Sequence, residues 1–372
     1  MKPILFISQQ FAPGHLTHVR AFVYMCEKIG LVPSLFLDEG YRAFCSDMED
    51  ECSIYYSRSA VLEAASKQQF NWAFVVNISK YDASLIKSLK ARCPNLRTLF
   101  WYHEPYAGLC KTIQMQFTGS LEGVIDCMKS FGRHYFVKQL LEETDLVVLP
   151  SSNAERVFNE SPDSRSMCVA QMPLAFNDCF ADSRDMLSEM DRPYFSFIST
   201  VQEKKGFSEF LDFVKYASDK NPNLKFLIAT RSDVESYMDD SLRSLIDDGI
   251  LAVKAGTPLT DEEINDAYRS TSCLWLGYHE STQSGVLAHS FMLGTPVLAT
   301  SLPAFNDYVD GRNGLVVNVN DLKNLDLLYR SMRTVQSNQK SFCSAARDTF
   351  EKNFDSRGLV KQFENVLSKA IA

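Results

Sequence analysis

The chain has 372 residues, of which 45% are hydrophobic, and 38 basic against 46 acidic residues give a net charge of -8. This length exceeds the size at which a single hydrophobic core usually stops growing, so we expect two domains. The acidic balance excludes a general attraction to nucleic acid, and no apolar run is long enough to cross a bilayer. The strand-like N-terminus carries no cleavage signal, so we expect a cytoplasmic protein.

The ten cysteines are scattered and form no Cys-x-x-Cys pair, and most lie in apolar segments. We therefore expect reduced thiols. Neither His and Cys at ligand spacing nor an Asp-x-Asp motif at a strand end is present, so no metal and no cofactor are expected.

Short apolar runs alternate with longer helical patterns along the whole chain, which is typical of a parallel sheet covered by helices on both faces. The predicted strands of the first half are Ile4–Ser8, Pro33–Leu37, Trp72–Asn77, Thr98–Tyr102 and Leu146–Pro150. The predicted helices of the first half are His15–Ile29, Ala60–Gln69 and Gly132–Glu143.

A second series with the same alternation follows an acidic break at Phe180–Arg192. Its predicted strands are Tyr194–Ser199, Lys225–Ala229, Leu251–Ala255, Ser272–Gly277, Pro296–Thr300 and Gly314–Val317. Its predicted helices are Phe207–Lys220, Asp261–Ser270, Gly285–Leu293 and Leu322–Gln336, and a last helix is expected over Arg357–Ala372.

The sequence therefore predicts an α/β protein with two Rossmann-like, doubly wound parallel-sheet domains facing a cleft. We place the first domain at residues 1–190 and the second at 191–355. Residues 356–372 are expected to form a helix that packs back on the first domain.

The segment from Gly277 to Thr300 reads as a buried strand, a polar loop, a helix that begins near Ser284-Gly285, and a Gly-Thr-Pro turn into another strand. A helix start directs unpaired N–H groups and the positive end of its dipole outward, which suits a phosphate. Gly285 would allow a diphosphate to come close. The alternative is that Ser284 only caps the helix.

This segment resembles the signature of the family 4 glycosyltransferases (glycosyl transferases group 1), which are retaining enzymes of the GT-B type. The resemblance continues upstream through 255–269 and downstream through 301–316, so that it runs in order from about Tyr194 to Val319. It implies the GT-B fold and a nucleotide-sugar donor held by the second domain.

In that family a Lys-Gly pair meets the donor diphosphate, and here Lys205-Gly206 stands at that place. Lysine acts there as a mobile point charge. The family usually has Arg five residues earlier, where this chain has Thr200. Arg231 or Lys204 would then supply the second basic contact.

The family also carries two Glu about eight positions apart, where this chain has Ser281 and His289. The resemblance implies that His289 contacts the donor ribose in place of the second Glu. The alternative is a partly buried histidine without a ligand. Glu280 lies one residue out of register. The remaining implied donor contacts are Glu280, Thr282 and Gln283 to the sugar, and Ser284, Gly285 and Val286 at the helix start.

The first domain contributes a loop and helix start that the resemblance places under the donor sugar. Gly14 would allow close approach, and His15 or His18 would touch a hydroxyl or phosphate; a plain loop capped by Pro-Gly is the alternative. The strand that ends at Tyr102 continues into His103-Glu104-Pro105-Tyr106. We expect His103 to contact the sugar, and Glu104 and Tyr106 to lie on the acceptor side. Ser151 and Ser152 are interpreted as a helix N-cap.

Basic and aromatic residues mix in the segment 129–138, as in a helix that touches a membrane surface. The same letters fit a helix with its apolar side in the core, which we favour. A peripheral membrane contact is therefore the less favoured of the two interpretations.

The resemblance implies a hexosyltransferase-like enzyme that moves a sugar from a nucleotide sugar to a saccharide or lipid-linked acceptor in polysaccharide biosynthesis. The implied catalytic residues are His103, Lys205 and Glu280. One alternative is an inactive GT-B subunit that binds another transferase, and the other is a GT-B sugar-nucleotide epimerase.

Overall fold

The structure is a computed structural model, and it describes residues 2–105, 132–161, 164, 167–181, 190–257 and 259–371. Two compact units are formed, one by Met1–Asn177 with Asp355–Ala372 and the other by Asp178–Phe354. The division thus falls earlier than the expected position after residue 190. The physical reason lies in Asp178, whose buried carboxylate pairs with Arg347 of helix α14 (Gln339–Asn353) in the second unit.

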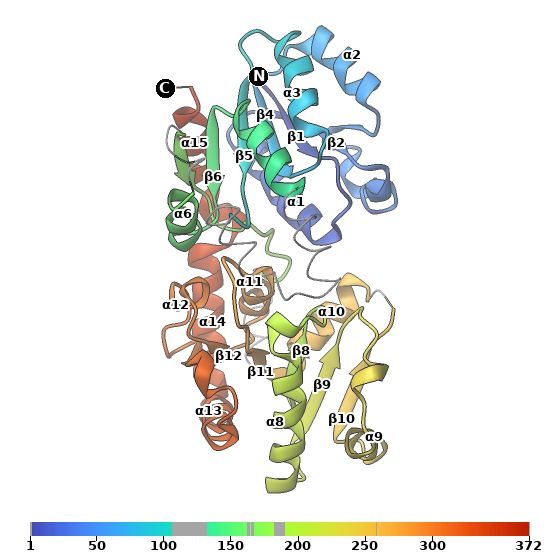
Figure 1. The fold of residues 1–372 in the computed structure, drawn as a ribbon, viewed down its shortest axis with the longest axis vertical. Helices are drawn as coiled ribbons and strands as arrows, with labels where there is room; N and C mark the ends of the chain where they lie inside the picture. Colours follow the sequence, from blue (N-terminus) through green and yellow to red (C-terminus); the bar gives the residue numbers. More distant parts are fainter. Residues whose placement is uncertain are drawn as a thin grey trace. The chain divides into compact units, whose positions relative to one another are not determined.

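The first unit contains a parallel sheet in the order β3-β2-β1-β4-β5-β6-β7 (Figure 1). Its strands are β1 (Pro3–Ser8), β2 (Val32–Leu37), β3 (Ser53–Tyr55), β4 (Trp72–Asn77), β5 (Arg97–Trp101), β6 (Leu146–Leu149) and β7 (Val169–Gln171). The helices described in this unit are α1 (Pro13–Lys28), α2 (Arg58–Gln68), α3 (Asp82–Lys90), a helix over 132–141, α6 (Ser152–Asn159) and α15 (Ser356–Lys369), with the 3-10 helices η1 (Glu39–Phe44) and η2 (Ser46–Met48).

Alternation along β1 sends side chains to both faces of this sheet. Leu5 and Ile7 join a core with α2, α3 and the helix over 132–141. Phe6 stacks on Phe22 of α1 at 5.7 Å between ring centroids, and Phe22 lies 5.5 Å from Phe363 of α15. The sheet is therefore covered on both faces, as the sequence predicts, and the C-terminal helix supplies part of one cover.

The helix over 132–141 turns its apolar side inward. Val137, Leu140 and Leu141 belong to the core of the first unit, whereas Tyr135 is exposed. This arrangement is the one that we favoured over membrane contact; residues 129–131 lie outside the described part. None of the described helices is long and apolar enough to span a membrane.

The second unit has a parallel sheet in the order β10-β9-β8-β11-β12-β13 (Figure 1). Its strands are β8 (Tyr194–Ile198), β9 (Lys225–Ala229), β10 (Leu251–Lys254), β11 (Thr271–Leu276), β12 (Val297–Thr300) and β13 (Gly314–Val317). The other elements described here are the helices α8 (Phe207–Lys220), α9 (Asp240–Asp247), α10 (Asp261–Arg269), α11 (Gly285–Met292), α12 (Pro303–Asn306), α13 (Leu325–Ser337) and α14, and the 3-10 helices η5 (Glu203–Lys205), η6 (Glu235–Tyr237) and η7 (Val319–Asp321).

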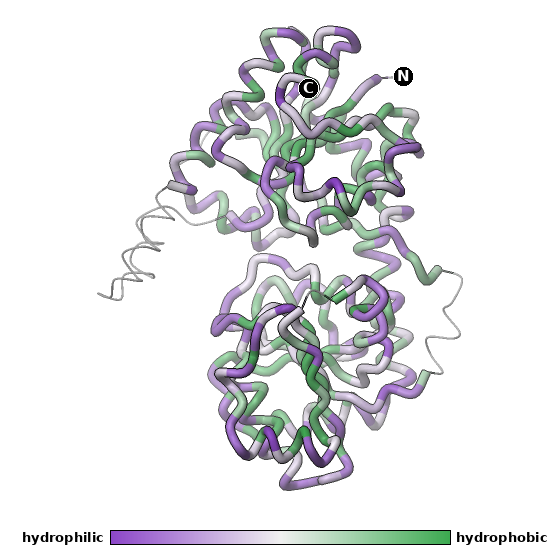
Figure 2. Tube along the Cα trace, turned by 90° about the vertical axis from the view of Figure 1, so that its right-hand side faces the viewer, coloured by the Kyte–Doolittle hydropathy of each residue, from purple (hydrophilic) through white to green (hydrophobic). Residues whose placement is uncertain are grey.

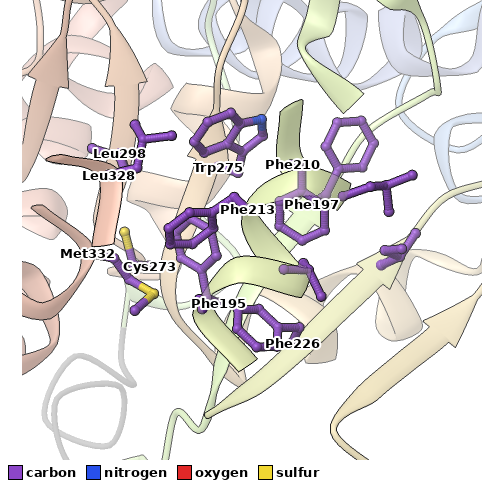
Figure 3. Close-up of a cluster of buried hydrophobic side chains, with 14 of the residues drawn as sticks. Phe195, Phe197, Phe210, Phe213, Phe226, Cys273, Trp275, Leu298, Leu328 and Met332 are labelled. Atoms are coloured by element: carbon purple, nitrogen blue, oxygen red, sulfur yellow. The ribbon is translucent and has the colours of Figure 1, made fainter. Parts of the chain in front are cut away.

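An aromatic core joins this second sheet to α8 and α13. The ring of Phe195 contacts the rings of Phe210, Phe213 and Trp275, and Phe213 stacks on Trp275 (Figure 3). Such rings bury large apolar areas, which stabilises the unit. Figure 2 shows hydrophobic residues in the interior of each unit and hydrophilic residues mainly toward its outside.

Local signals in the sequence set several helix starts. Thr260 and Glu263 form a capping box at the start of α10. Ser151 accepts a hydrogen bond from Ala154 N at 3.0 Å, so its interpretation as an N-cap is confirmed. These caps satisfy backbone N–H groups that a helix leaves unpaired.

Candidate functional site

The strand order of each sheet reverses at one place, between β1 and β4 in the first unit and between β8 and β11 in the second. Doubly wound sheets bind ligands beyond the carboxyl ends of the strands at such a switch point. In the second unit the two loops concerned are 199–206 after β8 and 277–284 after β11. They begin side by side because β8 and β11 pair in parallel.

The two loops of the second unit are joined by close backbone packing. Gly206 has a φ of 66°, and a Cβ on this residue would lie 2.1 Å from Gly277 O. The indole Nε1 of Trp275 donates to Gly206 O at 2.9 Å. The Lys205-Gly206 pair is therefore fixed against the end of β11, and glycine is required at 206 both for its backbone angle and for space.

Further contacts extend this junction. His279 N donates to Lys204 O at 2.9 Å, and its ring Nε2 contacts Glu209 Oε1 at 2.9 Å. Lys204 Nζ and Glu280 Oε1 are 3.8 Å apart, and both side chains are exposed. Glu280 and Lys204, two residues named from the sequence, thus lie together on the same two loops.

The ammonium of Lys205 is held by hydroxyl groups. Its Nζ donates to Ser199 Oγ at 2.7 Å and to Thr200 Oγ1 at 2.9 Å. It also lies 5.7 Å from the ring centroid of Tyr278. Ser199 and Thr200 therefore orient Lys205.

The loop after β11 leads from Tyr278, which lies beside the Lys205 ammonium, to the start of α11. Burial raises the pKa of the Tyr278 hydroxyl. Ser284 caps α11 by accepting from Leu287 N at 3.2 Å. Lys205 and the helix start at Gly285 thus belong to the two loops that follow the neighbouring strands β8 and β11. Apart from its chain neighbours and its own helix backbone, no atom of the described residues lies within 4 Å of a Cβ built on Gly285, so the space at this helix start is open.

The remaining loop residues are half-buried around this helix start. Ser281 Oγ donates to Gln283 O at 2.7 Å, which closes the loop on itself. The Gln283 side-chain Oε1 is buried and has no hydrogen-bond partner among the described residues. Thr282, which precedes Gln283, and Val286, the second residue of α11, are also half-buried.

His289 lies one turn further along α11. Its Nε2–H donates to Asn265 Oδ1 at 2.8 Å, and its ring centroid is 4.7 Å from that of Tyr268. Burial lowers the pKa of His289 to about 4, so the ring is neutral near pH 7. Arg231 is exposed in the loop after β9; its neighbour Ser232 accepts from Val201 N at 3.0 Å, which places this loop beside the loop after β8.

Two of the predicted residues of the first unit stack on one another. The rings of His15 and His103 are 4.8 Å apart with an interplanar angle of 14°. His103 Nε2–H donates to Val76 O at 2.6 Å. Burial is the main cause of the lowered pKa of both rings, which are therefore neutral near pH 7. The His15 Nδ1 is buried without a partner among the described residues.

The other predicted residues of this unit are placed differently. His18 is only 6% exposed, its Nδ1–H donates to Ala175 O at 2.9 Å, and burial lowers its pKa to about 4. It thus joins α1 to the segment before the unit boundary. Gly14 and Glu104 are exposed, and Glu104 lies 3.8 Å from Arg133. Tyr106 lies outside the described residues.

Sequence reasoning missed three residues of the second-unit site: Trp275, Tyr278 and Asn265. Tyr278 could have been noticed because it begins the polar loop after a buried strand. Trp275 and Asn265 give no signal of their own in the sequence, because their partners are distant along the chain. Among the described residues, no group of three or more His, Cys, Asp or Glu side chains is arranged to hold a metal ion.

The chain forms two doubly wound units, and the second carries a lysine and a helix start at its switch point. These features define the GT-B class of glycosyltransferase fold. Residues 192–332 match the family model of glycosyl transferases group 1. The chain thus has the GT-B fold, and the family match falls within its second unit. A comparison of the sequence with curated proteins found no match.

Solved structures agree with this fold. HepE of Anabaena, solved in complex with UDP, is 11% identical with a TM-score of 0.69, and 99% of this chain and 100% of that chain are covered. Sucrose-phosphate synthase from Thermosynechococcus elongatus is 15% identical with a TM-score of 0.68, and 99% of each chain is covered. A glycosyltransferase from Rickettsia africae is 12% identical with a TM-score of 0.69, and 100% of this chain and 98% of that chain are covered.

Proposed function

We propose that this protein transfers a sugar from a nucleotide sugar to a saccharide or lipid-linked acceptor, and that the second unit holds the donor diphosphate. The observation that carries the proposal is that the ammonium of Lys205, held by Ser199 and Thr200, and the start of α11 at Gly285 belong to the two loops at the switch point of this unit. A diphosphate is the ligand whose charge and oxygen atoms suit such a pair.

The open space at Gly285 supports the same assignment. Gly206 is required by the packing of the protein itself, because Gly277 O occupies the position of a Cβ. At Gly285 no atom of the described residues outside its own helix and chain neighbours comes within 4 Å of a Cβ, so packing among them does not explain the glycine. A phosphate group that approaches the backbone N–H groups closely is a reason for glycine at this position.

In the proposed reaction the departing diphosphate gains negative charge, and Lys205 with the N–H groups of α11 stabilises that charge. The reaction retains the configuration of the sugar, and the diphosphate accepts the proton of the acceptor hydroxyl. The neutral rings of His103 and His15 in the first unit contact hydroxyl groups of the substrates. His289 contacts the donor ribose.

Uridine nucleotides are the first donors to test, because HepE has been solved with UDP-glucose. The protein is incubated with UDP-, GDP- and ADP-sugars and an acceptor mixture, and released nucleotide is detected by mass spectrometry. We expect release from one class of donor and its loss in Lys205→Met. Lys215→Met is the matched control, because Lys215 of α8 pairs with Asp239, the N-cap residue of α9.

The alternatives give different results. A catalytically inactive subunit would show no thermal shift with any nucleotide, in keeping with Thr200 and His289 at the positions where the family has Arg and Glu. An epimerase would release a sugar epimer without acceptor. Either outcome would overturn the proposed transfer.

A further inference from the structure

Two aromatic side chains of the first unit lie next to each other at its surface. Phe11, in the loop after β1, is 40% exposed, and Phe44, the last residue of η1, is 50% exposed. Their ring centroids are 5.8 Å apart with an interplanar angle of 31°. Single apolar residues are common on a protein surface, whereas adjoining ones point to a ligand. We call these two rings the aromatic pair.

The loop that carries Phe11 is fixed by hydrogen bonds to its backbone. The buried Tyr41 hydroxyl accepts from Ala12 N at 2.9 Å and lies 3.1 Å from Gln10 O. Asn77 Nδ2, at the end of β4, also donates to Gln10 O at 3.1 Å. The Phe11 ring meets the Tyr41 ring edge-on, with 5.0 Å between the centroids. The exposed ring therefore stands on a loop with a defined conformation.

The surroundings of both rings keep them in place. A Cβ on Gly40 would lie 2.9 Å from Phe11 Cγ, so glycine at this position gives the Phe11 ring its room. Arg20 of α1 donates to Phe44 O at 2.8 Å and pairs with Asp47, which ties the end of η1 to α1. The aromatic pair is thus organised before a ligand arrives, and binding to it would order few groups of the protein.

The aromatic pair lies beside the switch point of the first sheet. The loop 9–12 follows β1 and is tied to the end of β4, and the strand order reverses between these two strands. The same loop ends at Ala12, the N-cap residue of α1, and His15 follows in the first turn of that helix. Doubly wound sheets bind their ligands at this edge. The pair therefore has the position expected of a substrate contact.

The charge of the segment that carries Phe44 selects the kind of ligand. Residues 38–51 contain one arginine, Arg42, against six carboxylates, a formal charge of -5; the carboxylates are Asp38, Glu39, Asp47, Glu49, Asp50 and Glu51. Such a surface repels anionic lipid and sulfated or phosphorylated polymers. A neutral saccharide fits, because its ring has an apolar face for the aromatic pair and its hydroxyl groups can donate to carboxylate oxygens.

We propose that Phe11 and Phe44 form a stacking surface for a neutral saccharide, which is the acceptor of the transfer. One face of the sugar ring lies on the aromatic pair, and its hydroxyl groups donate to carboxylates of the segment 38–51. This inference rests on the proposed function, and it adds the class of acceptor and the part of the first unit that binds it.

Leucine substitutions test the aromatic faces while an apolar side chain is kept. Binding of the full chain to an array of neutral and sulfated glycans is measured for wild type, Phe11→Leu, Phe44→Leu and Phe44→Tyr. We expect wild type to bind one or more neutral glycans, and each leucine variant to bind them about fivefold more weakly, as the loss of one aromatic contact implies. Phe44→Tyr keeps the ring, so its affinity should stay within about twofold of wild type.

Val32→Ala is the matched control for the loss of an exposed apolar side chain. Val32 is 39% exposed and begins β2, at the edge of the sheet opposite to the loop after β1. Its glycan binding should equal that of wild type. Thermal unfolding of every variant checks that the fold is kept.

Three results would overturn the inference. The leucine variants bind neutral glycans as wild type does, or wild type binds no neutral glycan. In the third, wild type binds phosphatidylglycerol vesicles through the two rings and prefers them to neutral glycans, which would assign the aromatic pair to a membrane.

Binding of UDP, GDP and ADP, measured by titration calorimetry, separates this inference from the proposed function. We expect the leucine variants to bind the nucleotide of wild type with unchanged affinity, because the aromatic pair does not touch the donor. Nucleotide binding without any glycan binding would end the acceptor assignment and leave the donor site standing. Glycan binding by a wild type that binds no nucleotide would refute the proposed function, and the acceptor role would fall with it.

Discussion

The carbonyl oxygen of Gly277 lies where a side chain on Gly206 would have to be, 2.1 Å from the position of its Cβ. This contact locks the loop after β8 to the end of β11, and Trp275 adds a hydrogen bond to Gly206 O. The position of Lys205 therefore depends on two glycines that are distant in the sequence.

Gly206→Ala should be strongly destabilising. The new Cβ meets backbone, and the φ of 66° is strained for alanine, so we expect a loss of more than about 3 kcal/mol in the free energy of unfolding. Gly311→Ala is the control, since its φ is 82° but its surroundings are open; it should cost about 1 kcal/mol. Chemical denaturation measures both, and similar losses would contradict a role for the Gly277 contact.

His289→Ala should reduce discrimination between UDP and 2′-deoxy-UDP. The neutral ring is fixed by Asn265, and in the proposed function it contacts a ribose hydroxyl. One hydrogen bond is worth about 1 kcal/mol, or roughly fivefold in affinity. Calorimetry with both nucleotides measures the ratio. The control is His279→Ala, whose ring contacts Glu209; an unchanged ratio in His289→Ala would remove the ribose assignment.

Asp82→Asn should change the pH dependence of stability. Burial raises the pKa of Asp82 to about 6, although Gln9 and Ser79 donate hydrogen bonds to it. The pKa of Asp82 in the folded protein lies above its unfolded value near 4. The stabilisation that the protonated Asp82 provides is therefore fully present below pH 4 and is lost as pH rises through 6. This loss lowers the free energy of unfolding by about 3 kcal/mol.

The stability of Asp82→Asn relative to wild type should therefore increase between pH 4 and pH 7. Urea denaturation at the two pH values measures this change. Asp240→Asn, at an exposed position of α9, controls for the loss of one carboxylate. Parallel pH profiles for wild type and Asp82→Asn would show that Asp82 does not titrate in this range.

Phe363→Ala should destabilise the first unit. The Phe363 side chain is fully buried and contacts the rings of Phe22 and Phe74. Removal of such a ring costs about 3 to 5 kcal/mol. Thermal unfolding checks this value, with the exposed neighbour Glu364→Ala as control. An equally small effect of both variants would show that α15 adds little to the core of this unit.

Much of the fold follows from the sequence because its signals are local. Strands β4, β9 and β13 and helix α8 have the predicted bounds. Buried parallel strands give continuous apolar runs, and turns mark their ends. Strands β3 and β7 were missed because they have three residues each at the edges of the sheet. Such short segments carry no detectable period.

The sequence by itself determined the two parallel sheets, the helix start at Gly285 and the place of Lys205 just before the first helix of the second unit. Only the tertiary structure decided that Gly277 and Trp275 fix the Lys205-Gly206 pair, that Asn265 orients His289, and that His18 is buried. The reason is physical: strand and helix patterns arise between neighbouring residues, whereas hydrogen bonds of the site join loops that the parallel sheet brings together from far apart in the chain.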